Sequence, residues 1–486
     1  MAGSEPADAL DAVASAVRER HVIVVGGGIA GLVGALECAK VGLRVTLLEA
    51  SDRLGGAVRT VEAGGFVLDA AVEGWSARGG AVRALAEELG LGSAIVFDAD
   101  AETWIAGLPG AAPLPRRAIA GIPENPWDER VRRIIGWRGT WRAYLDRVRP
   151  PLTIGKERSL GRLVRTRMGD AVLERLVAPV SIGVYGTHPD DVDVEAVAPG
   201  LSTALTRTGS LSGAVFDLLV DRSSGPPREG LAGGMPRLIA AAHDRLTALG
   251  VEVRTGVAAE RLESQPGGRW SVLTSDESPL DPADEVIVAA PETEARRLLS
   301  PVVPALDGPV GGAHPVEVVT LVVGSVPGER RDALYPVPGT ARAVAVVDST
   351  VRWPWLAATV GDGVHVLRVT FGAAGLPAAT AELDDAAAAE LARSEASLLL
   401  GHELRDVRGA ARARFDPPRP ASALGHAEAA DAVRGAIEAV PGLSAVGAWL
   451  AGSGLAQVVP DALAEADRVR RRALWSGPED RLVPEA

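Results

Sequence analysis

The sequence is poor in cysteine, in aromatic residues and in long apolar runs. Cys38 is the only cysteine among 486 residues, so no intrachain disulfide, Cys-x-x-Cys pair or cysteine-based zinc cluster can form. No window reaches the roughly 18 uninterrupted apolar residues of a membrane-spanning helix, and residues 1–20 lack the apolar core of a signal peptide. A formal net charge of −13 disfavours general nucleic-acid binding. We therefore expect a soluble, cytoplasmic protein whose length allows several domains.

One stretch near the start, His21–Thr60, carries most of the information in the chain. Its leading residues, His21–Val25, predict a buried parallel strand, and a second apolar run, Leu43–Leu48, predicts another. The first strand is followed by the turn Gly26-Gly27-Gly28-Ile29-Ala30-Gly31 and a helical pattern, and the second by Glu49 and Ala50. A glycine turn between strand and helix, with an acid at the tip of the next strand, indicates a dinucleotide-binding fold.

Each glycine of this turn has its own physical role. Gly26 permits the tight turn out of the strand, Gly28 lets the backbone approach a pyrophosphate, and Gly31 lets the helix pack against the strand. The first helical N–H groups, at Ile29-Ala30, would then meet the phosphates. Glu49 would accept hydrogen bonds from both ribose hydroxyls, and its charge disfavours the 2′-phosphate of NADP.

The next residues, Arg53-Leu54-Gly55-Gly56, extend the motif. The extended pattern resembles that of FAD-binding enzymes, in which a second glycine turn, here Gly55-Gly56, passes beneath the FAD pyrophosphate. The resemblance implies that Arg53 and Arg59 lie near the phosphates, although an exposed loop would also explain both arginines. Cys38 stands in the first helix, whose core face does not meet the flavin ring, so we expect the FAD to be bound non-covalently.

Two distant segments complete the predicted cofactor site. Near the C-terminus a short strand, Leu443–Val446, leads into a glycine-rich loop, and a helical pattern follows. In FAD oxidoreductases of this superfamily such a loop meets the flavin, which implies contacts from Trp449, Gly454 and Leu455 and stabilisation of negative charge by helix N–H groups. In the middle of the chain, the resemblance implies that the backbone of Val257 contacts the adenine.

We therefore predict an α/β fold, α+β overall, with a Rossmann-like FAD-binding domain assembled from separate parts of the chain. The predicted FAD domain takes residues 19–80, 228–300 and 436–475, between a flexible extension at 1–18 and a tail at 476–486. Residues 81–227 are predicted to be mainly helical, with a long helix over Trp127–Arg149. Residues 301–435 indicate a mixed or antiparallel sheet and an alanine-rich helix over Glu382–Leu400. These two insertions are expected to form the substrate side.

Blocks outside the flavin motifs narrow the family. They are Ala84–Leu91, Pro179–Tyr185 with His188-Pro189, Gly233–Met235, Val351–Trp355 and Gly425-His426. Together they resemble the protoporphyrinogen/coproporphyrinogen oxidase family, above all its soluble actinobacterial coproporphyrinogen III oxidases. The resemblance runs from about His21 to Val469.

This resemblance implies an oxygen-dependent oxidase of haem biosynthesis that prefers coproporphyrinogen III. A porphyrinogen would lose hydride from a meso carbon to flavin N5, and oxygen would reoxidise the flavin with release of hydrogen peroxide. Three rounds would yield the aromatic porphyrin. Aromatisation supplies the driving force. The protein therefore has to position the substrate, exclude water from it and tune the flavin, and it needs neither a strong nucleophile nor a metal. We therefore assign no catalytic side chain and expect no metal site.

A tetrapyrrole with propionate groups needs cationic partners. The resemblance implies that Arg78 faces the substrate and that Tyr185 lines the cavity; a solvated loop arginine is the alternative for Arg78. His188 and His426 fit capping or packing better than catalysis.

Residues 130–149 carry seven arginines on an otherwise acidic chain. Ile134, Ile135, Trp137 and Trp141 accompany them. Three interpretations stay open: a solvated helix face, propionate binding, and docking to a partner or to an anionic membrane surface.

Three stretches depart from the family pattern, namely Asp69-Ala70-Ala71, Phe371–Gly375 and Arg414–Ser422, which includes Arg419–Ala421. They leave other functions open: a protoporphyrinogen IX oxidase, an amine oxidase or desaturase, or a tetrapyrrole-binding flavoprotein without turnover. With three Tyr and five Phe, the chain offers little for the aromatic cage of an amine oxidase. The oligomeric state and the docking of a haem-pathway ferrochelatase are also left open.

Overall fold

The computed structural model describes residues 17–108, 111–149, 157–220, 228–308, 315–328 and 330–475. The extension predicted over 1–18 lies almost wholly outside the described residues, and the tail predicted over 476–486 lies entirely outside them. None of the helices within those ranges combines the length and the apolar character needed to cross a membrane.

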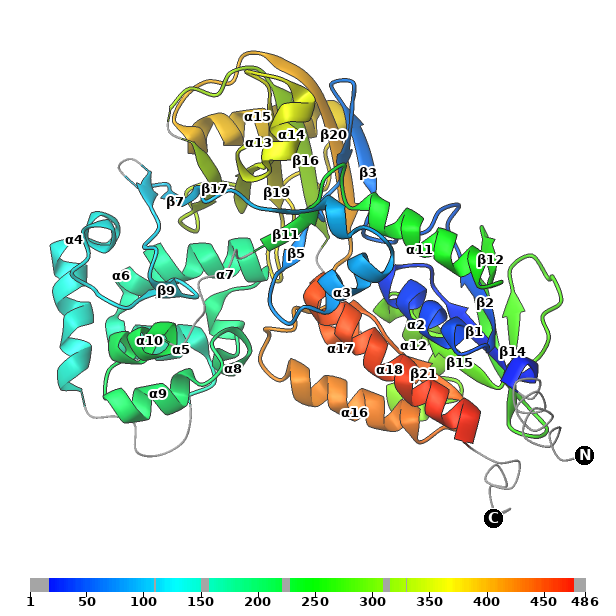
Figure 1. Cartoon of the computed structure of the whole chain (residues 1–486). Coiled ribbons are helices and arrows are strands. Elements are labelled where there is room, and N and C mark those ends of the chain that lie inside the picture. Colours follow the sequence, from blue (N-terminus) through cyan, green and yellow to red (C-terminus); the bar gives the residue numbers. More distant parts are fainter. Residues whose placement is uncertain are drawn as a thin grey trace, which may run out of the picture.

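A five-stranded parallel sheet forms one part of the molecule, on the right in Figure 1. Its order is β12-β2-β1-β15-β21, and every neighbouring pair is parallel. The strands are β1 (His21–Val25), β2 (Arg44–Glu49), β12 (Glu252–Thr255), β15 (Glu285–Val288) and β21 (Leu443–Ala445). The sheet is thus assembled from three separated stretches of the chain.

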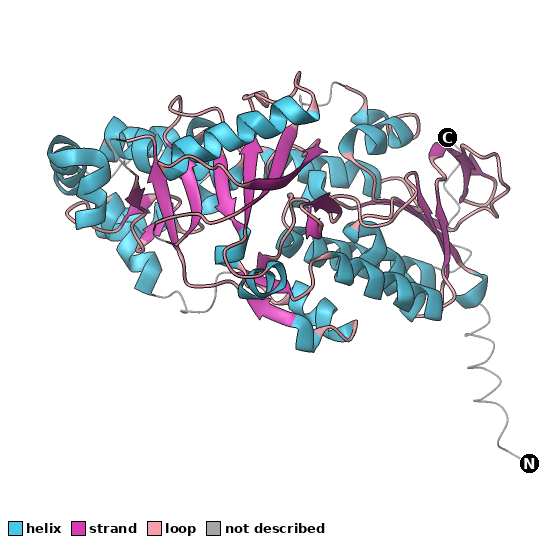
Figure 2. Cartoon of the chain, turned by 90° about the horizontal axis from the view of Figure 1, so that it is seen from above, coloured by secondary structure: helices cyan, strands magenta, loops and turns pink. Residues whose placement is uncertain are grey.

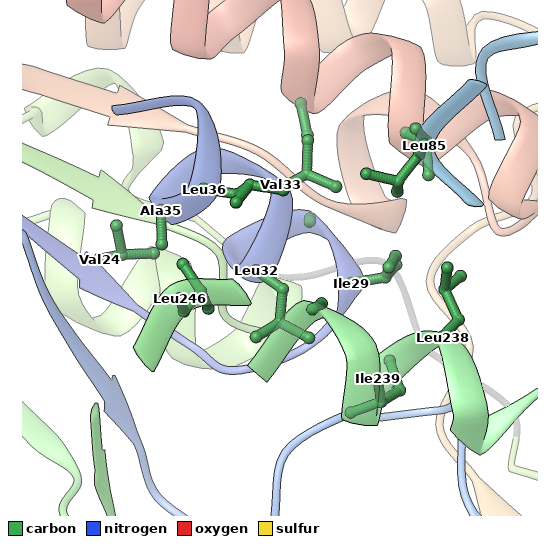
Figure 3. Packing of buried hydrophobic residues seen from close by; sticks show 14 of the residues in the cluster. Val24, Ile29, Leu32, Val33, Ala35, Leu36, Leu85, Leu238, Ile239 and Leu246 are labelled. Carbon is green, nitrogen blue, oxygen red and sulfur yellow. The ribbon is translucent and has the colours of Figure 1, made fainter. Parts of the chain in front are cut away.

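Helices cover both faces of this sheet, which is why its central strands are apolar on both sides. On one face α2 (Ile29–Lys40) packs with α11 (Pro236–Ala248), α18 (Leu455–Trp475) and α3 (Ala81–Glu88). Figure 3 shows Ile29 and Leu32 of α2 among Leu238, Ile239 and Leu246 of α11. On the other face lie α12 (Glu292–Leu299), α16 (His426–Glu438) and α17 (Ala448–Ala451). Cys38 is buried within α2, and burial raises the pKa of its thiol to about 12.

A second sheet, with seven strands, lies apart from the parallel sheet, at the top in Figure 1, and has helices of its own (Figures 1 and 2). Its order is β20-β16-β19-β18-β17-β7-β8, antiparallel throughout except for the parallel pair β17–β7. The strands are β7 (Glu102–Ala106), β8 (Ala112–Pro113), β16 (Val316–Val323), β17 (Arg331–Pro336), β18 (Ala345–Asp348), β19 (His365–Phe371) and β20 (Val407–Phe415). The predicted mixed sheet is confirmed, but β7 and β8 come from the stretch predicted to be mainly helical.

The alanine-rich helix packs against this second sheet as α15 (Asp385–Leu400). It begins three residues later than predicted because Asp384 caps it, accepting a hydrogen bond from the Ala387 N–H at 2.8 Å.

A helical region fills the remaining side of the molecule, on the left in Figure 1. Its helices are α4 (Glu129–Tyr144), α5 (Leu160–Met168), α6 (Asp170–Val172), α7 (Ala178–Tyr185), α8 (Val194–Val197), α9 (Leu201–Thr208) and α10 (Leu211–Val220). The helix predicted over Trp127–Arg149 is shorter than expected. Asp128 caps its start, and Gly136 breaks it with φ 70°. The grouping of Ile134 and Ile135 with the exposed tryptophans was wrong, since both isoleucines are buried in the core of this region.

Short strands join the two sheets. A hairpin of β3 (Thr60–Ala63) and β4 (Phe66–Asp69) follows the second glycine turn, and β3 lies beside β20. A three-stranded sheet, β5-β11-β6, comprises β5 (Trp75–Ser76), β11 (Arg228–Leu231) and β6 (Ile95–Phe97). The chain between β4 and β5 therefore runs from the hairpin, which lies beside the seven-stranded sheet, to the three-stranded sheet.

Candidate functional site

The first glycine turn has the tight geometry that its sequence predicts. Gly26 has φ 112°, and its N–H donates to the Leu48 carbonyl at 2.7 Å. A Cβ on Gly31 would overlap the Gly26 carbonyl oxygen, so α2 can pack against the strand only with glycine there.

Gly28 differs from its neighbours because it faces open space. A Cβ built there would meet no atom of the protein within 4 Å. Gly28 is also the N-cap of α2 and has no side chain to satisfy the first N–H groups of the helix. The turn therefore forms a cradle with a partial positive charge, which fits the pyrophosphate of a dinucleotide.

Glu49 is fixed at the tip of β2 by three hydrogen bonds. Its carboxylate accepts from the Gly27 N–H at 2.6 Å, from the Ser51 N–H at 2.8 Å and from the Ser51 hydroxyl at 2.7 Å. Its backbone carbonyl accepts from the Val257 N–H at 3.0 Å. The structure thus brings together Glu49, which was predicted to bind the ribose, and Val257, which was predicted to contact the adenine. Ala50, also predicted to bind the cofactor, directly follows Glu49.

The second glycine turn lies against the first. The Gly55 N–H donates to the Gly27 carbonyl at 2.8 Å, and Gly28 and Gly55 form a parallel bridge. Gly55 and Gly56 have φ values of 110° and 58°, which favour glycine.

An arginine-rich groove of about 480 Å³ borders this second turn. Arg53, Arg59, Thr60, Val61, Asp385, Arg412, Ala413 and Arg414 line it. Burial lowers the pKa of Arg59, and repulsion from the guanidinium of Arg53 lowers it further. Positive charge is therefore concentrated beside the cradle.

The C-terminal loop reaches the same place from the other end of the chain. Leu455, the first residue of α18, shares a core cluster with Ile29. Trp449 is buried, the guanidinium of Arg296 lies 5.8 Å from its ring centroid, and its Nε1 finds no hydrogen-bond partner in the described protein. The Gly454 N–H donates to Gln457 Oε1 at 3.3 Å. A buried indole N–H without an acceptor suits a site that a ligand completes.

The two predicted substrate residues lie on separate elements. Arg78 is exposed in the loop after β5, its backbone N–H donates to the Ser76 hydroxyl at 3.4 Å, and no carboxylate of the described chain pairs with its guanidinium. Tyr185 ends α7 and packs, half-buried, against the core of the helical region.

The two histidines behave as packing and capping groups. His188 Nδ1 accepts from the Asp190 N–H at 3.3 Å, at the start of a 3₁₀ turn. His426 is buried at the start of α16, and burial lowers the pKa of its imidazole. Within the described ranges, no group of three or more His, Cys, Asp or Glu side chains is arranged to hold a metal.

Sequence reasoning missed a set of buried charges where the seven-stranded sheet meets the segment between β4 and β5. We call it the junction cluster: Glu73, Asp332, Arg352 and Arg368, with Asp69 next to it. Arg368 could have been noticed, because it interrupts the apolar strand Val366–Phe371 at a buried position. Nothing in the sequence indicates its partners, the Glu73 carboxylate and the Asp69 carbonyl, which lie almost three hundred residues earlier in the chain.

Comparison with known proteins identifies the family. The model of flavin containing amine oxidoreductases matches residues 29–473. The chain belongs to this family.

Curated relatives and a solved structure agree with this assignment. The coproporphyrinogen III oxidase of Propionibacterium freudenreichii is 28% identical, covering 94% of this chain and 92% of its own. That of Mycobacterium leprae is 30% identical, covering 75% and 80%. A solved structure assigned as a protoporphyrinogen oxidase of Exiguobacterium sp. 255-15 superposes with a TM-score of 0.81 at 24% identity, covering 93% and 98%, and so supports the fold. The chain is therefore an FAD-dependent oxidoreductase.

Proposed function

We propose that this flavin-dependent oxidoreductase is a coproporphyrinogen III oxidase that uses oxygen and forms coproporphyrin III and hydrogen peroxide. The observation that carries the proposal is the match, over nearly the whole chain, to coproporphyrinogen III oxidases of other bacteria. The unpaired guanidinium of Arg78 beside β5 supports it, because a porphyrinogen with propionate groups needs cations.

In this proposal the chain's own residues bind the cofactor, orient the substrate and shield both from water. The cradle at Gly26–Gly31 and the arginines at 53 and 59 would hold the pyrophosphate of FAD, which would supply a two-electron acceptor that oxygen regenerates. The buried indole N–H of Trp449 would be available as a donor to the cofactor. Arg78 pairs with a propionate, and Tyr185 lines the cavity. Residues 81–227 and 301–435 enclose the substrate and exclude water, so that positioning carries most of the catalysis.

The test supplies purified holoprotein with coproporphyrinogen III under air and follows porphyrin fluorescence together with peroxide. Three equivalents of peroxide per porphyrin are the expected result. Parallel reactions with protoporphyrinogen IX and with putrescine separate the neighbouring activities of the family. A yellow protein that forms neither porphyrin nor peroxide would be a flavoprotein without this turnover, and the proposal would fall.

The exposed face of α4 offers a surface for a partner. Trp137 and Trp141 are 61% and 54% exposed, and Trp127 packs edge-on against both, with ring centroids 5.8 and 4.9 Å away. Tyr144 joins them, 5.7 Å from Trp127. Arg132 lies over Trp137 and Arg147 over Tyr144.

We infer that this face touches an anionic membrane surface. Exposed aromatic rings with polar tips, interleaved with arginines, suit the headgroup region of a bilayer. Other arginines of the stretch serve the protein itself, because Arg130 pairs with Glu102, Arg133 with Glu129, and Arg142 donates to backbone carbonyls of α5.

A further inference from the structure

The junction cluster holds four charged side chains in one buried chain of ion pairs. Glu73 lies 3.1 Å from Arg368 and 3.7 Å from Arg352, and Arg352 lies 3.3 Å from Asp332. The side chains of all four are at most 11% exposed. The pKa of Arg352 is lowered by burial but raised more by Glu73 and Asp332, and ends above its ordinary value. Two buried cations are therefore neutralised by two buried carboxylates.

One end of the cluster fixes the segment that leads to Arg78. Glu73 precedes Gly74, where a Cβ would overlap the Glu229 carbonyl oxygen and touch the ring of Trp353. The Trp75 indole N–H donates to Glu229 at 3.0 Å, and Trp75 shares its core cluster with Ile29 and Leu455 of the cofactor site. The backbone between residues 73 and 76 is thus clamped beside the cofactor site, and Arg78 follows directly.

The other end reaches the wall that carries Tyr185. Asp332 lies on β17, and its carboxylate also accepts from the Thr103 hydroxyl at 2.9 Å. Tyr335, on the same strand, is buried, and a Cβ on Gly183 of α7 would overlap its ring. Tyr185 stands two residues after Gly183 on that helix.

The cluster therefore links the segment that precedes Arg78 to β17, the strand that packs against α7, and α7 ends in Tyr185. A buried ion pair is a weak source of stability, because desolvation offsets most of the Coulomb attraction. An apolar contact could hold the same elements together. Ion pairs made to one carboxylate are directional, so they also fix the orientation of that carboxylate.

We propose that Glu73, held by Arg352 and Arg368, is a positioning residue that sets the place of Arg78 relative to Tyr185 and so determines porphyrin affinity. This role rests on the proposed function. In this role Glu73 acts through Arg78 and not on the flavin.

The test compares wild-type holoprotein with Glu73→Gln, which keeps the shape and removes the charge. Titration with coproporphyrin III, followed by fluorescence quenching, measures affinity without turnover. We expect Kd for coproporphyrin III and KM for coproporphyrinogen III to rise about tenfold, with kcat and flavin content within about twofold. Glu73→Asp should recover part of the loss, and it also serves if the glutamine variant folds poorly.

A matched control comes from a second buried pair. Asp146 pairs with Arg167 in the helical region, and their side chains are 1% and 2% exposed. Asp146→Asn should lower the melting temperature without changing porphyrin Kd. In the background of Arg78→Ala, Glu73→Gln should have little further effect, because the two residues act as one unit.

The possible outcomes distinguish a failure of the proposed function from a failure of the positioning role. Wild-type protein that does not bind coproporphyrin III overturns the proposed function and this role with it. Wild-type binding that Glu73→Gln leaves unchanged, or that Asp146→Asn weakens equally, overturns the positioning role alone. If the losses of porphyrin affinity caused by Arg78→Ala and Glu73→Gln are additive in the double variant, the positioning role is overturned as well.

Discussion

The glycine turn and the junction cluster solve the same problem, holding two parts of the chain in a fixed relation, by opposite means. At Gly26, Gly27, Gly28 and Gly31 side chains are absent, and backbone groups make the site. At Glu73, Arg352 and Arg368 large charged side chains meet in the core. Gly26 and Gly31 leave no room for an added carbon, whereas Gly28 leaves open space for a ligand. A short motif can thus define a cofactor site, whereas the proposed substrate site depends on pairs distant in sequence.

The largest effect should come from separating the two roles of glycine within the turn. Gly31→Ala places a Cβ on the Gly26 carbonyl oxygen and should prevent folding to the native state. Gly28→Val meets no protein atom at its Cβ, and its backbone is extended, so the fold should survive while FAD is lost. Circular dichroism and flavin absorbance of the purified variants measure the two outcomes. Stoichiometric flavin in Gly28→Val would show that the cradle has been misassigned.

Arg78 tests the substrate side independently of the cofactor. Arg78→Ala removes a cation that no described carboxylate pairs with, so KM for coproporphyrinogen III should rise about tenfold while flavin content stays constant. Arg245→Ala, at an exposed position on α11, is the matched control for loss of a positive charge. An unchanged KM would remove Arg78 from the site.

Asp69 lies at the boundary between the two regions. Its carboxylate accepts from the Met235 N–H at 2.9 Å, its carbonyl accepts from Arg368, and burial raises its pKa to about 6 from 3.8. Because the folded state holds this proton more tightly, the contribution of Asp69 to stability is greatest below pH 4 and declines as pH rises to about 6.

Asp69→Asn keeps an acceptor for Met235 and removes that pH dependence. Relative to wild type, the variant should gain stability between pH 4 and 7, by at most about 3 kcal/mol for a shift of this size. Urea unfolding of both proteins at several pH values measures the difference. A difference that does not change with pH would place the titrating group elsewhere.

The smallest effect should concern α4, which lies away from both regions. Vesicles of phosphatidylcholine with about one third phosphatidylglycerol should bind the protein, and pure phosphatidylcholine should not. Joint replacement of Trp137 and Trp141 by alanine should weaken binding several-fold and leave turnover in solution unchanged. Equal binding to both vesicle types would argue against charge recognition.

Local patterns predicted the elements around the cofactor well. β1 begins and ends where the apolar run does, and α2 follows the glycine turn directly, because strand, turn and helix depend on neighbouring residues. Glu49 lies at the end of its strand beside the turn, as the dinucleotide motif requires. The cofactor roles of Ala50, Arg53 and Val257 remain predictions.

Longer-range features escaped the sequence for physical reasons. The number of arginines correctly indicated that residues 130–149 are basic. The helix is broken at Gly136, so the helical periodicity of the sequence did not reveal that Ile134 and Ile135 face the core. The strand β7 joins β17 in parallel across more than two hundred residues, and no local pattern encodes that pairing. Glu73 and Asp332 meet the same arginine for the same reason.

The order of the parallel sheet has a consequence for synthesis. β1 is made first, yet its neighbour β15 pairs Val22 with Glu285, and the edge strand β21 begins only at Leu443. At typical translation rates β1, whose partner β2 follows it closely in the chain, waits tens of seconds for its other partner, β15. Such non-local pairing closes long loops and slows folding. A nascent chain therefore exposes the free edge of β1 until β15 is made, and the parallel sheet is complete only after β21 has left the ribosome.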